Sequence, residues 1–184
     1  MNIMLANVKS FQTPLTSIKL VQKNINEINK YEWNRIIYLS KQTRYHIRNI
    51  EDNDLYKIYY GRYSDLCKNY QIYEDDKMIA NCFIDRVKLF NNDTIVISNY
   101  LTGLNRDLDD KYKGIGTLFL NMILNNKKLV YLKPANENLE IMYKKLDFIP
   151  TNLKGIGNCR FPIYVKYSDS DFPKDEFNEK CVLK

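Results

Sequence analysis

The sequence has little histidine and no closely spaced cysteines. His46 is the only histidine among 184 residues, which argues strongly against a histidine-based metal site or a Ser-His-Asp triad. The four cysteines, Cys67, Cys82, Cys159 and Cys181, lie far apart, so no CxxC pair and no zinc-ligand spacing is present. We therefore expect reduced thiols in a cytoplasmic protein that binds no metal.

Long hydrophobic runs are also missing. No apolar stretch is long enough to span a bilayer, and the N-terminus lacks the charged and apolar regions of a secretory signal, so we expect no membrane partner. The net charge of +6 by itself permits nucleic acid, an anionic membrane surface or a phosphate-bearing cofactor as a partner. The basic residues are spread along the chain, which argues against nucleic acid without excluding that class.

Hydrophobic periodicity predicts one α/β or α+β domain over residues 1–184. Strands are expected at 17–22, 70–74, 77–90, 94–101, 128–132 and 161–167, and helices at 24–39, 52–67, 114–125 and 137–146. Asn24 and Glu27 have the spacing of a capping box, which predicts the first helix start. Residues 1–16 are expected to form an extension or a short edge strand, and residues 169–184 a poorly ordered polar tail. A polar loop is expected at 102–110.

The segment 111–117, Lys-Tyr-Lys-Gly-Ile-Gly-Thr, joins a predicted strand to a predicted helix. Gly114 and Gly116 would let the backbone approach a ligand closely. The first N–H groups of a helix have no internal partner and favour an anion such as a pyrophosphate. Lys111 and Lys113 add positive charge. Taken alone, the pattern fits an ordinary helix start with two glycines equally well.

The chain repeats the letters Lys-Gly-Ile-Gly at 154–157, where Pro162 and a strand pattern follow. We interpret this second copy as a loop between strands, so the context distinguishes the two copies. Two other phosphate-binding motifs do not fit the first copy. A Walker A loop needs Gly-Lys-Ser/Thr, and a Rossmann fingerprint needs a third glycine or alanine beyond Thr117.

Two motifs resemble those of one enzyme family. Lys111-x-x-Gly114-x-Gly116 is similar to the Gln/Arg-x-x-Gly-x-Gly/Ala signature of the GCN5-related N-acetyltransferase (GNAT) family. Residues 136–148 resemble a second family pattern, Asn-x-x-Ala-x-x-Leu-Tyr-x-Lys-Leu-Gly-Phe. The match covers about residues 94–148, and the separation of the two motifs makes it far more specific than either motif alone.

The chain departs from the family pattern at three positions. Lys111 replaces the usual Gln or Arg, which keeps a positive charge but loses the fork of a guanidinium group. Leu139 stands where Ala is common. Asp147 replaces the glycine that ends the helix and tolerates a left-handed backbone less well.

The resemblance implies a mixed central sheet with a splay between two parallel strands, 94–101 and 128–132, flanked by helices. It implies acetyl-CoA as co-substrate and Tyr143 as the general acid that reprotonates the leaving thiolate. Tyr143 could equally be a buried residue of an amphipathic helix, and without the motif this second interpretation would be preferred. The implied CoA-binding residues are Lys111, Tyr112, Lys113, Gly114, Ile115, Gly116, Thr117 and Asn136.

The resemblance leaves the acceptor open. The leading hypothesis is a primary amine of a small molecule, such as a polyamine, an amino sugar or an amino acid. Alternatives are an amine of a protein, peptide or aminoacyl-tRNA, and a CoA-binding module without catalysis. A homodimer is compatible with the sequence.

The general base cannot be read from the sequence. Asp85 could face the substrate, and Ser98 and Asn99 could order a water molecule. A solvated loop is expected for Asp107, Asp109 and Asp110, and the acceptor pocket is expected near Glu32, Trp33, Tyr38, Tyr45 and His46.

Overall fold

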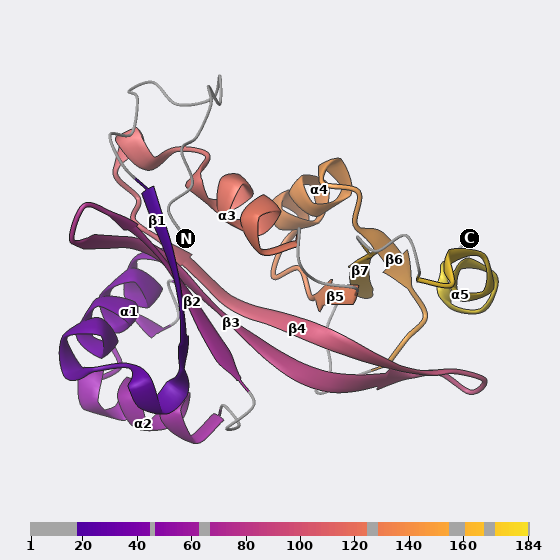
Figure 1. Cartoon of the computed structure of the whole chain (residues 1–184), viewed down its shortest axis with the longest axis horizontal. Helices are drawn as coiled ribbons and strands as arrows, with labels where there is room; N and C mark the ends of the chain where they lie inside the picture. Colours follow the sequence, from indigo (N-terminus) through magenta and orange to yellow (C-terminus); the bar gives the residue numbers. More distant parts are fainter. Residues whose placement is uncertain are drawn as a thin grey trace. The chain divides into compact units, whose positions relative to one another are not determined.

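The strands form one mixed sheet of seven, in the order β1-β2-β3-β4-β5-β7-β6, with β4 and β5 parallel (Figure 1). The computed structural model describes residues 18–44, 47–62, 67–124, 129–154, 161–167 and 172–183. The fold class expected from the sequence is confirmed. The chain divides into two compact units: unit 1 holds the described residues up to Asp85 and Thr102–Met122, and unit 2 holds Arg86–Leu101 and the described residues from Ile123.

Unit 1 contains the first strands and the first two long helices. Its elements are β1 (Ile18–Asn24), η1 (Ile25–Glu27), α1 (Lys30–Thr43), α2 (Asp52–Arg62), β2 (Lys68–Glu74), most of β3 (Lys77–Phe90), the end of β4 (Ile95–Arg106), η3 (Asp110–Tyr112) and most of α3 (Ile115–Leu124). β1 pairs with β2 and β2 with β3, both antiparallel. A shared core that includes Trp33, Ile36, Leu55 and Phe83 holds α1 and α2 against these strands.

The start of α1 corrects the sequence analysis. Asn24 and Glu27 do form a capping box, in which the Glu27 carboxylate accepts the Asn24 N–H at 2.7 Å, but it opens only the short 3-10 turn η1. A second box, formed by Asn29 and Glu32, starts α1 at Lys30, with the Glu32 N–H donating to Asn29 Oδ1 at 2.9 Å. Two Asn-x-x-Glu boxes five residues apart leave room for one turn between them.

β4 also differs from the prediction, because it continues through the expected polar loop as far as Arg106. Gly103 within this stretch has a φ of 61°. The buried Asn105 donates a hydrogen bond to Asn81 on β3 at 3.3 Å. The Asp107 N–H donates to the Ile79 carbonyl at 2.7 Å. Cross-strand bonds of this kind stabilise polar residues in a strand and leave no mark in the hydrophobic pattern.

Unit 2 is built around short strands. Its elements are the remaining parts of β3 and β4, the end of α3, β5 (Leu129–Leu132), α4 (Glu137–Lys145), β6 (Ile149–Thr151), β7 (Ile163–Tyr167) and α5 (Lys174–Cys181). β7 pairs antiparallel with both β5 and β6. The sequence analysis did not predict β6, a strand of three residues.

The expectation of a poorly ordered tail after Ser168 is wrong for residues 174–181, which form α5. Phe177 and Cys181, one turn apart, are buried in a core with residues of β3, β5 and β7. Two apolar positions give too weak a periodicity to predict a helix, so packing decides its formation.

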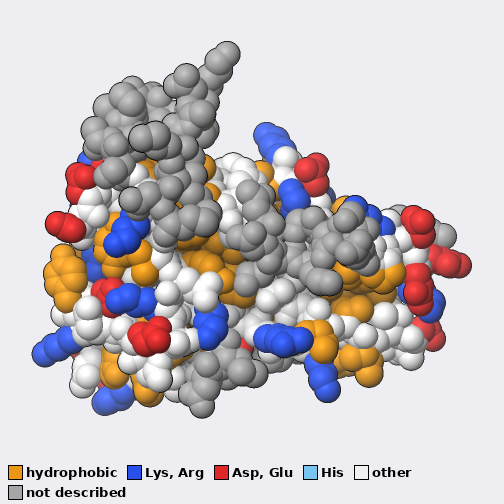
Figure 2. Space-filling model, viewed as in Figure 1, with side chains coloured by type: hydrophobic (Ala, Val, Ile, Leu, Met, Phe, Trp, Pro, Cys, Tyr) orange, Lys and Arg blue, Asp and Glu red, His pale blue; other side chains and the backbone are white. Residues whose placement is uncertain are grey.

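Several expectations fall outside the described residues. These are the extension at 1–16, the end of the second helix at 63–66, residues 125–128, and the second Gly-Ile-Gly copy at 155–157. Within the described ranges, no helix combines the length and the apolar character needed to cross a bilayer. On the face in Figure 2, the Lys and Arg side chains drawn in colour lie among acidic ones and do not merge into one basic patch.

Asp107 anchors the end of β4 in unit 1. Its side chain is only 7% exposed, and Oδ2 accepts from Arg35 of α1 at 2.8 Å and from Lys77 of β3 at 2.9 Å. Oδ1 accepts the Asp109 N–H at 3.1 Å. Burial by itself raises the pKa of this carboxyl. Its contacts with Lys77, the Asp109 N–H and Arg35 lower the pKa by a larger amount, so the pKa of Asp107 lies below the ordinary value.

We expect Asp107→Asn to lower the free energy of unfolding by about 2–4 kcal/mol, since the substitution leaves the part-buried Arg35 without its anion. Urea denaturation measures the change. Asp110→Asn, an exposed change three residues away, serves as the control and should shift stability by less than about 0.5 kcal/mol. Equal effects of the two substitutions would contradict the anchoring role.

Candidate functional site

The predicted phosphate loop lies in unit 1 and ends at the start of α3. The short turn η3 leads to Gly114, whose φ of 90° is strained for any residue with a side chain. The first intrahelical bond runs from the Leu118 N–H to the Gly114 carbonyl at 3.1 Å. The N–H groups of residues 115–117 therefore precede the first helical bond, the position from which a helix binds an anion.

The second glycine of the motif has a different role from the first. Among the residues that the structure describes, a Cβ atom added to Gly116 would meet only the Cδ atom of Arg106, at 3.9 Å, which is an ordinary van der Waals contact. Packing within the free protein therefore does not require glycine at position 116. The backbone conformation requires it at Gly114.

Lys111 and Tyr112 meet at one carboxylate. Glu74, the last residue of β2, accepts the Tyr112 hydroxyl at 2.6 Å and the Lys111 ammonium at 2.9 Å. The Lys111 ammonium also lies over the Tyr112 ring, 4.6 Å from its centroid. The two residues thus fix the loop to the sheet, and much of the Lys111 charge is offset by Glu74.

The Glu74 contacts shift three pKa values. Burial raises the pKa of Glu74, but the Tyr112 and Lys111 hydrogen bonds outweigh it and hold that pKa below the ordinary value. The same hydrogen bond to Glu74 raises the pKa of Lys111. Burial, together with the bond to Glu74, raises the pKa of Tyr112. All three groups therefore keep the protonation states that the contact needs at neutral pH.

Two other cations lie near the start of α3. Within the described part of the chain, the exposed Lys113 side chain has no recorded hydrogen bond or ion pair. Arg106 contacts the open side of Gly116 and donates from Nη1 to the Asp107 carbonyl at 3.4 Å. The sequence analysis missed both Arg106 and Glu74, which carry no motif and take part only through the pairing of β2, β3 and β4.

The second predicted segment lies in unit 2, on α4. Asn136 caps this helix, since its Oδ1 accepts the Leu139 N–H at 2.9 Å. Tyr143 is 5% exposed, and its ring contacts that of Phe148 with a centroid separation of 5.7 Å. Asp147 takes the left-handed conformation, with a φ of 62°, as expected at the glycine position of the motif.

The residues considered for the base have other contacts. Ser98 and Asn99 both donate to the Leu129 carbonyl on β5, at 3.4 and 2.9 Å. Asp85 on β3 has at least one interaction partner. Asp107 is an ion-paired anchor and not a solvated loop residue, which corrects that expectation. These contacts do not single out a base among the side chains.

The residues expected near the acceptor pocket are placed as follows. Glu32 is buried and bound to Lys23 at 2.6 Å, while Trp33 is buried between α1 and the sheet. Tyr38 is exposed and accepts a hydrogen bond from Gln42. Tyr45 and His46 lie outside the described residues. Among the residues that the structure describes, no group of three or more His, Cys, Asp or Glu side chains could hold a metal ion.

We expect Glu74→Gln to destabilise the protein by about 1–3 kcal/mol at neutral pH, because it removes a charged acceptor that two donors share. The folded pKa of Glu74 is lowered, so this contribution is present above the ordinary value of 4.5 and is lost as the pH falls below it. Denaturation at pH 7 and at pH 3 measures the difference between the two proteins. The neighbouring exposed change Asp76→Asn should show no such pH-dependent difference, and a gap that stays constant with pH would refute the charge effect.

This protein resembles known proteins in structure, and its sequence matches none of the family models or curated proteins compared with it. A GNAT-family acetyltransferase from Staphylococcus aureus is 12% identical with a TM-score of 0.58, covering 83% of this chain and 100% of that one. An acyl-CoA N-acyltransferase from Pseudomonas aeruginosa is 12% identical with a TM-score of 0.53, covering 81% and 97%.

A predicted acetyltransferase from Clostridium acetobutylicum, solved with acetyl-CoA, is 18% identical with a TM-score of 0.54, covering 77% of this chain and 96% of that one. Each alignment spans nearly all of the other chain, so the likeness extends over the whole fold and beyond the two motifs. This protein therefore has the fold of the GNAT acetyltransferases.

Proposed function

We propose that this protein is an acyl-CoA-dependent N-acyltransferase that uses acetyl-CoA and no metal. The observation that carries the proposal is the pair of glycines at the start of α3. Gly114 is required by its backbone angle, whereas Gly116 has room for a side chain that it does not carry. Neither the backbone angle nor the packing requires glycine at position 116. A ligand that must approach the backbone closely would explain why a glycine stands there.

In this proposal the CoA pyrophosphate binds at the N–H groups of Ile115, Gly116 and Thr117. Lys113 and Arg106 supply positive charge beside them. Lys111 and Tyr112, tied to Glu74, hold the loop in its shape. Asn136 is assigned to the pantetheine arm while its side chain also caps α4.

The proposed reaction is a direct attack of the acceptor amine on the acetyl carbonyl. An amine with a pKa of about 10 must first lose a proton. The new C–N bond forms as the C–S bond breaks, and the leaving thiolate takes a proton from the Tyr143 hydroxyl.

The proposed acceptor is a primary amine of a small molecule. A protein, peptide or aminoacyl-tRNA amine is the alternative acceptor, and a CoA-binding module without catalysis is the alternative class. A homodimer and a cytoplasmic location remain predictions. Cys67, Cys82 and Cys181 are buried, and burial raises the pKa of Cys67 to about 12. Thiol release from acetyl-CoA across a panel of amines tests the activity and identifies the acceptor.

Gly116→Ala should weaken acetyl-CoA binding at least about tenfold, because the added methyl group occupies the space that the pyrophosphate needs. It should not destabilise the free protein, since the new Cβ makes only an ordinary contact. Isothermal titration with acetyl-CoA and thermal melts without ligand measure the two effects.

The matched control is Gly61→Ala on α2, where an added Cβ would meet no atom of the described residues within 4 Å. This variant should melt like Gly116→Ala and bind acetyl-CoA like the wild type. If Gly116→Ala binds acetyl-CoA with unchanged affinity, the loop does not hold the cofactor. A wild-type protein that gains no thermal stability at about 100 times a micromolar Kd, where about 2.7 kcal/mol is expected, would exclude the cofactor.

Tyr143→Phe should lower kcat by about 10²- to 10⁴-fold while the KM for acetyl-CoA changes little, since only proton transfer is lost. The control is Tyr164→Phe in the same unit, which removes a buried hydroxyl that bonds to Glu140. Steady-state kinetics across pH compare the two variants. An equal loss in both would assign the effect to packing instead of proton transfer.

A further inference from the structure

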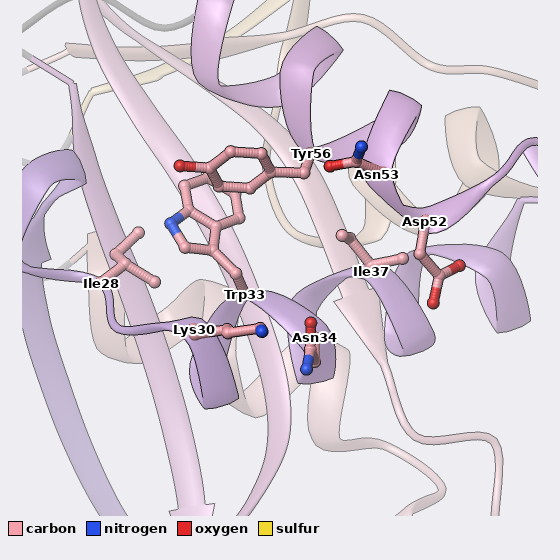
Figure 3. A pocket seen from close by; sticks show the side chains of 8 residues that line it. All are labelled: Ile28, Lys30, Trp33, Asn34, Ile37, Asp52, Asn53 and Tyr56. Atoms are coloured by element: carbon pink, nitrogen blue, oxygen red, sulfur yellow. The ribbon is translucent and has the colours of Figure 1, made fainter.

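A pocket between α1 and α2 of unit 1 is separate from every residue assigned to CoA. It has a volume of about 480 Å³ and is lined by Ile28, Lys30, Trp33, Asn34, Ile37, Asp52, Asn53 and Tyr56 (Figure 3). This volume is within the usual range for sites that bind small organic molecules. None of the lining residues belongs to the phosphate loop or to α4.

The floor of the pocket is apolar and aromatic. Ile28, Trp33 and Ile37 are between 2% and 7% exposed, so their side chains are fixed by the core beneath them. Tyr56 meets Trp33 edge-on, with a centroid separation of 5.4 Å and an interplanar angle of 89°. Such a floor favours a ligand with a flat or otherwise apolar body.

Polar groups converge on this floor from both helices. In Figure 3 the Lys30 ammonium and the Asn34 amide line one side, and Asn53 and Tyr56 from α2 line the other. An apolar floor with a few convergent polar groups is typical of small-molecule sites. The amides can donate hydrogen bonds to a carboxylate.

The charged side chains that line the pocket determine which ligand charge it favours. Asp52 is already paired with Lys41, whose ammonium lies 2.5 Å from Oδ1. In the described part of the chain the Lys30 ammonium has no recorded hydrogen bond or ion pair, and its side chain reaches into the pocket. The uncompensated charge in the pocket is therefore positive.

From this floor and this charge, we propose that the pocket binds a small monocarboxylate with an aromatic or similarly flat apolar body. The carboxylate pairs with Lys30 and accepts hydrogen bonds from the amides of Asn34 and Asn53. The apolar body lies against Trp33, Ile37 and Tyr56. Trp33 was also expected near the acceptor pocket, but no lining residue is assigned to the cofactor or to proton transfer, so this site is tested separately from the acyltransferase proposal.

The chain provides its own probe for the test. Trp33 is the only tryptophan, so its indole N–H gives the one indole resonance in a proton–nitrogen NMR spectrum of the full chain. Phenylacetate is titrated to about 10 mM, beside two matched probes, 2-phenylethylamine and 2-phenylethanol. We expect phenylacetate to shift this resonance with a saturable Kd of about 1 mM or lower. The amine and the alcohol should bind at least tenfold more weakly.

Lys30→Gln should weaken phenylacetate binding about tenfold and remove the preference for it over the alcohol. Lys57→Gln, which changes a lysine of α2 outside the pocket, should behave like the wild type. Asn34→Leu gives a second variant at an exposed position, and it should weaken phenylacetate severalfold even if Lys30→Gln fails to fold. Thermal melts of each variant establish that it is folded.

Three results would overturn the proposal. The indole resonance fails to move with any probe, the three probes bind alike, or folded Lys30→Gln and Asn34→Leu both bind phenylacetate as the wild type does. None of these results depends on acetyl-CoA. The pocket can thus fail while the acyltransferase proposal holds, and the reverse is also true.

Discussion

The carboxylate of Asp107 joins three parts of unit 1 that the chain brings together from distant positions. Arg35 comes from α1, Lys77 from β3, and the N–H of Asp109 from the turn that leads to α3. Such a buried carboxylate is tolerated only because both of its oxygens are satisfied. Its position fixes where β4 ends, and therefore where the proposed phosphate loop begins. Glu74 then holds the next turn through Lys111 and Tyr112.

Together these two carboxylates explain why a loop rich in charge has a defined path. Lys111 is paired with Glu74, so the cations left for the proposed ligand are Lys113 and Arg106. The two glycines of the loop have different roles. Gly114 lets the backbone turn into α3, and Gly116 keeps the first turn of the helix open. A helix N-terminus that is held still in this way binds an anion without having to reorganise.

The pocket between α1 and α2 depends on different physics. Trp33 stacks on Phe83 of the sheet and forms a T-shaped pair with Tyr56, so the aromatic floor results from core packing. The polar groups around it come from the first turns of both helices. Trp33 was expected near an acceptor pocket from the sequence. That Lys30 and Asn53 line the same pocket depends on how the two helices pack, which the sequence does not show.

Local sequence patterns by themselves predicted several elements of this fold. The hydrophobic alternation of Lys77–Phe90 predicted β3 with its observed bounds, and the motifs at Lys111–Gly116 and Asn136–Phe148 predicted the GNAT fold. Asp147 at the glycine position predicted its left-handed backbone, because that conformation is a property of one residue and its neighbours. Tertiary structure alone decided the extension of β4 to Arg106, the helix at Lys174–Cys181, and the anchoring of Lys111 by Glu74. These features rest on partners far away in the chain, and a side chain's choice between solvent and such a partner is not encoded in its own neighbourhood.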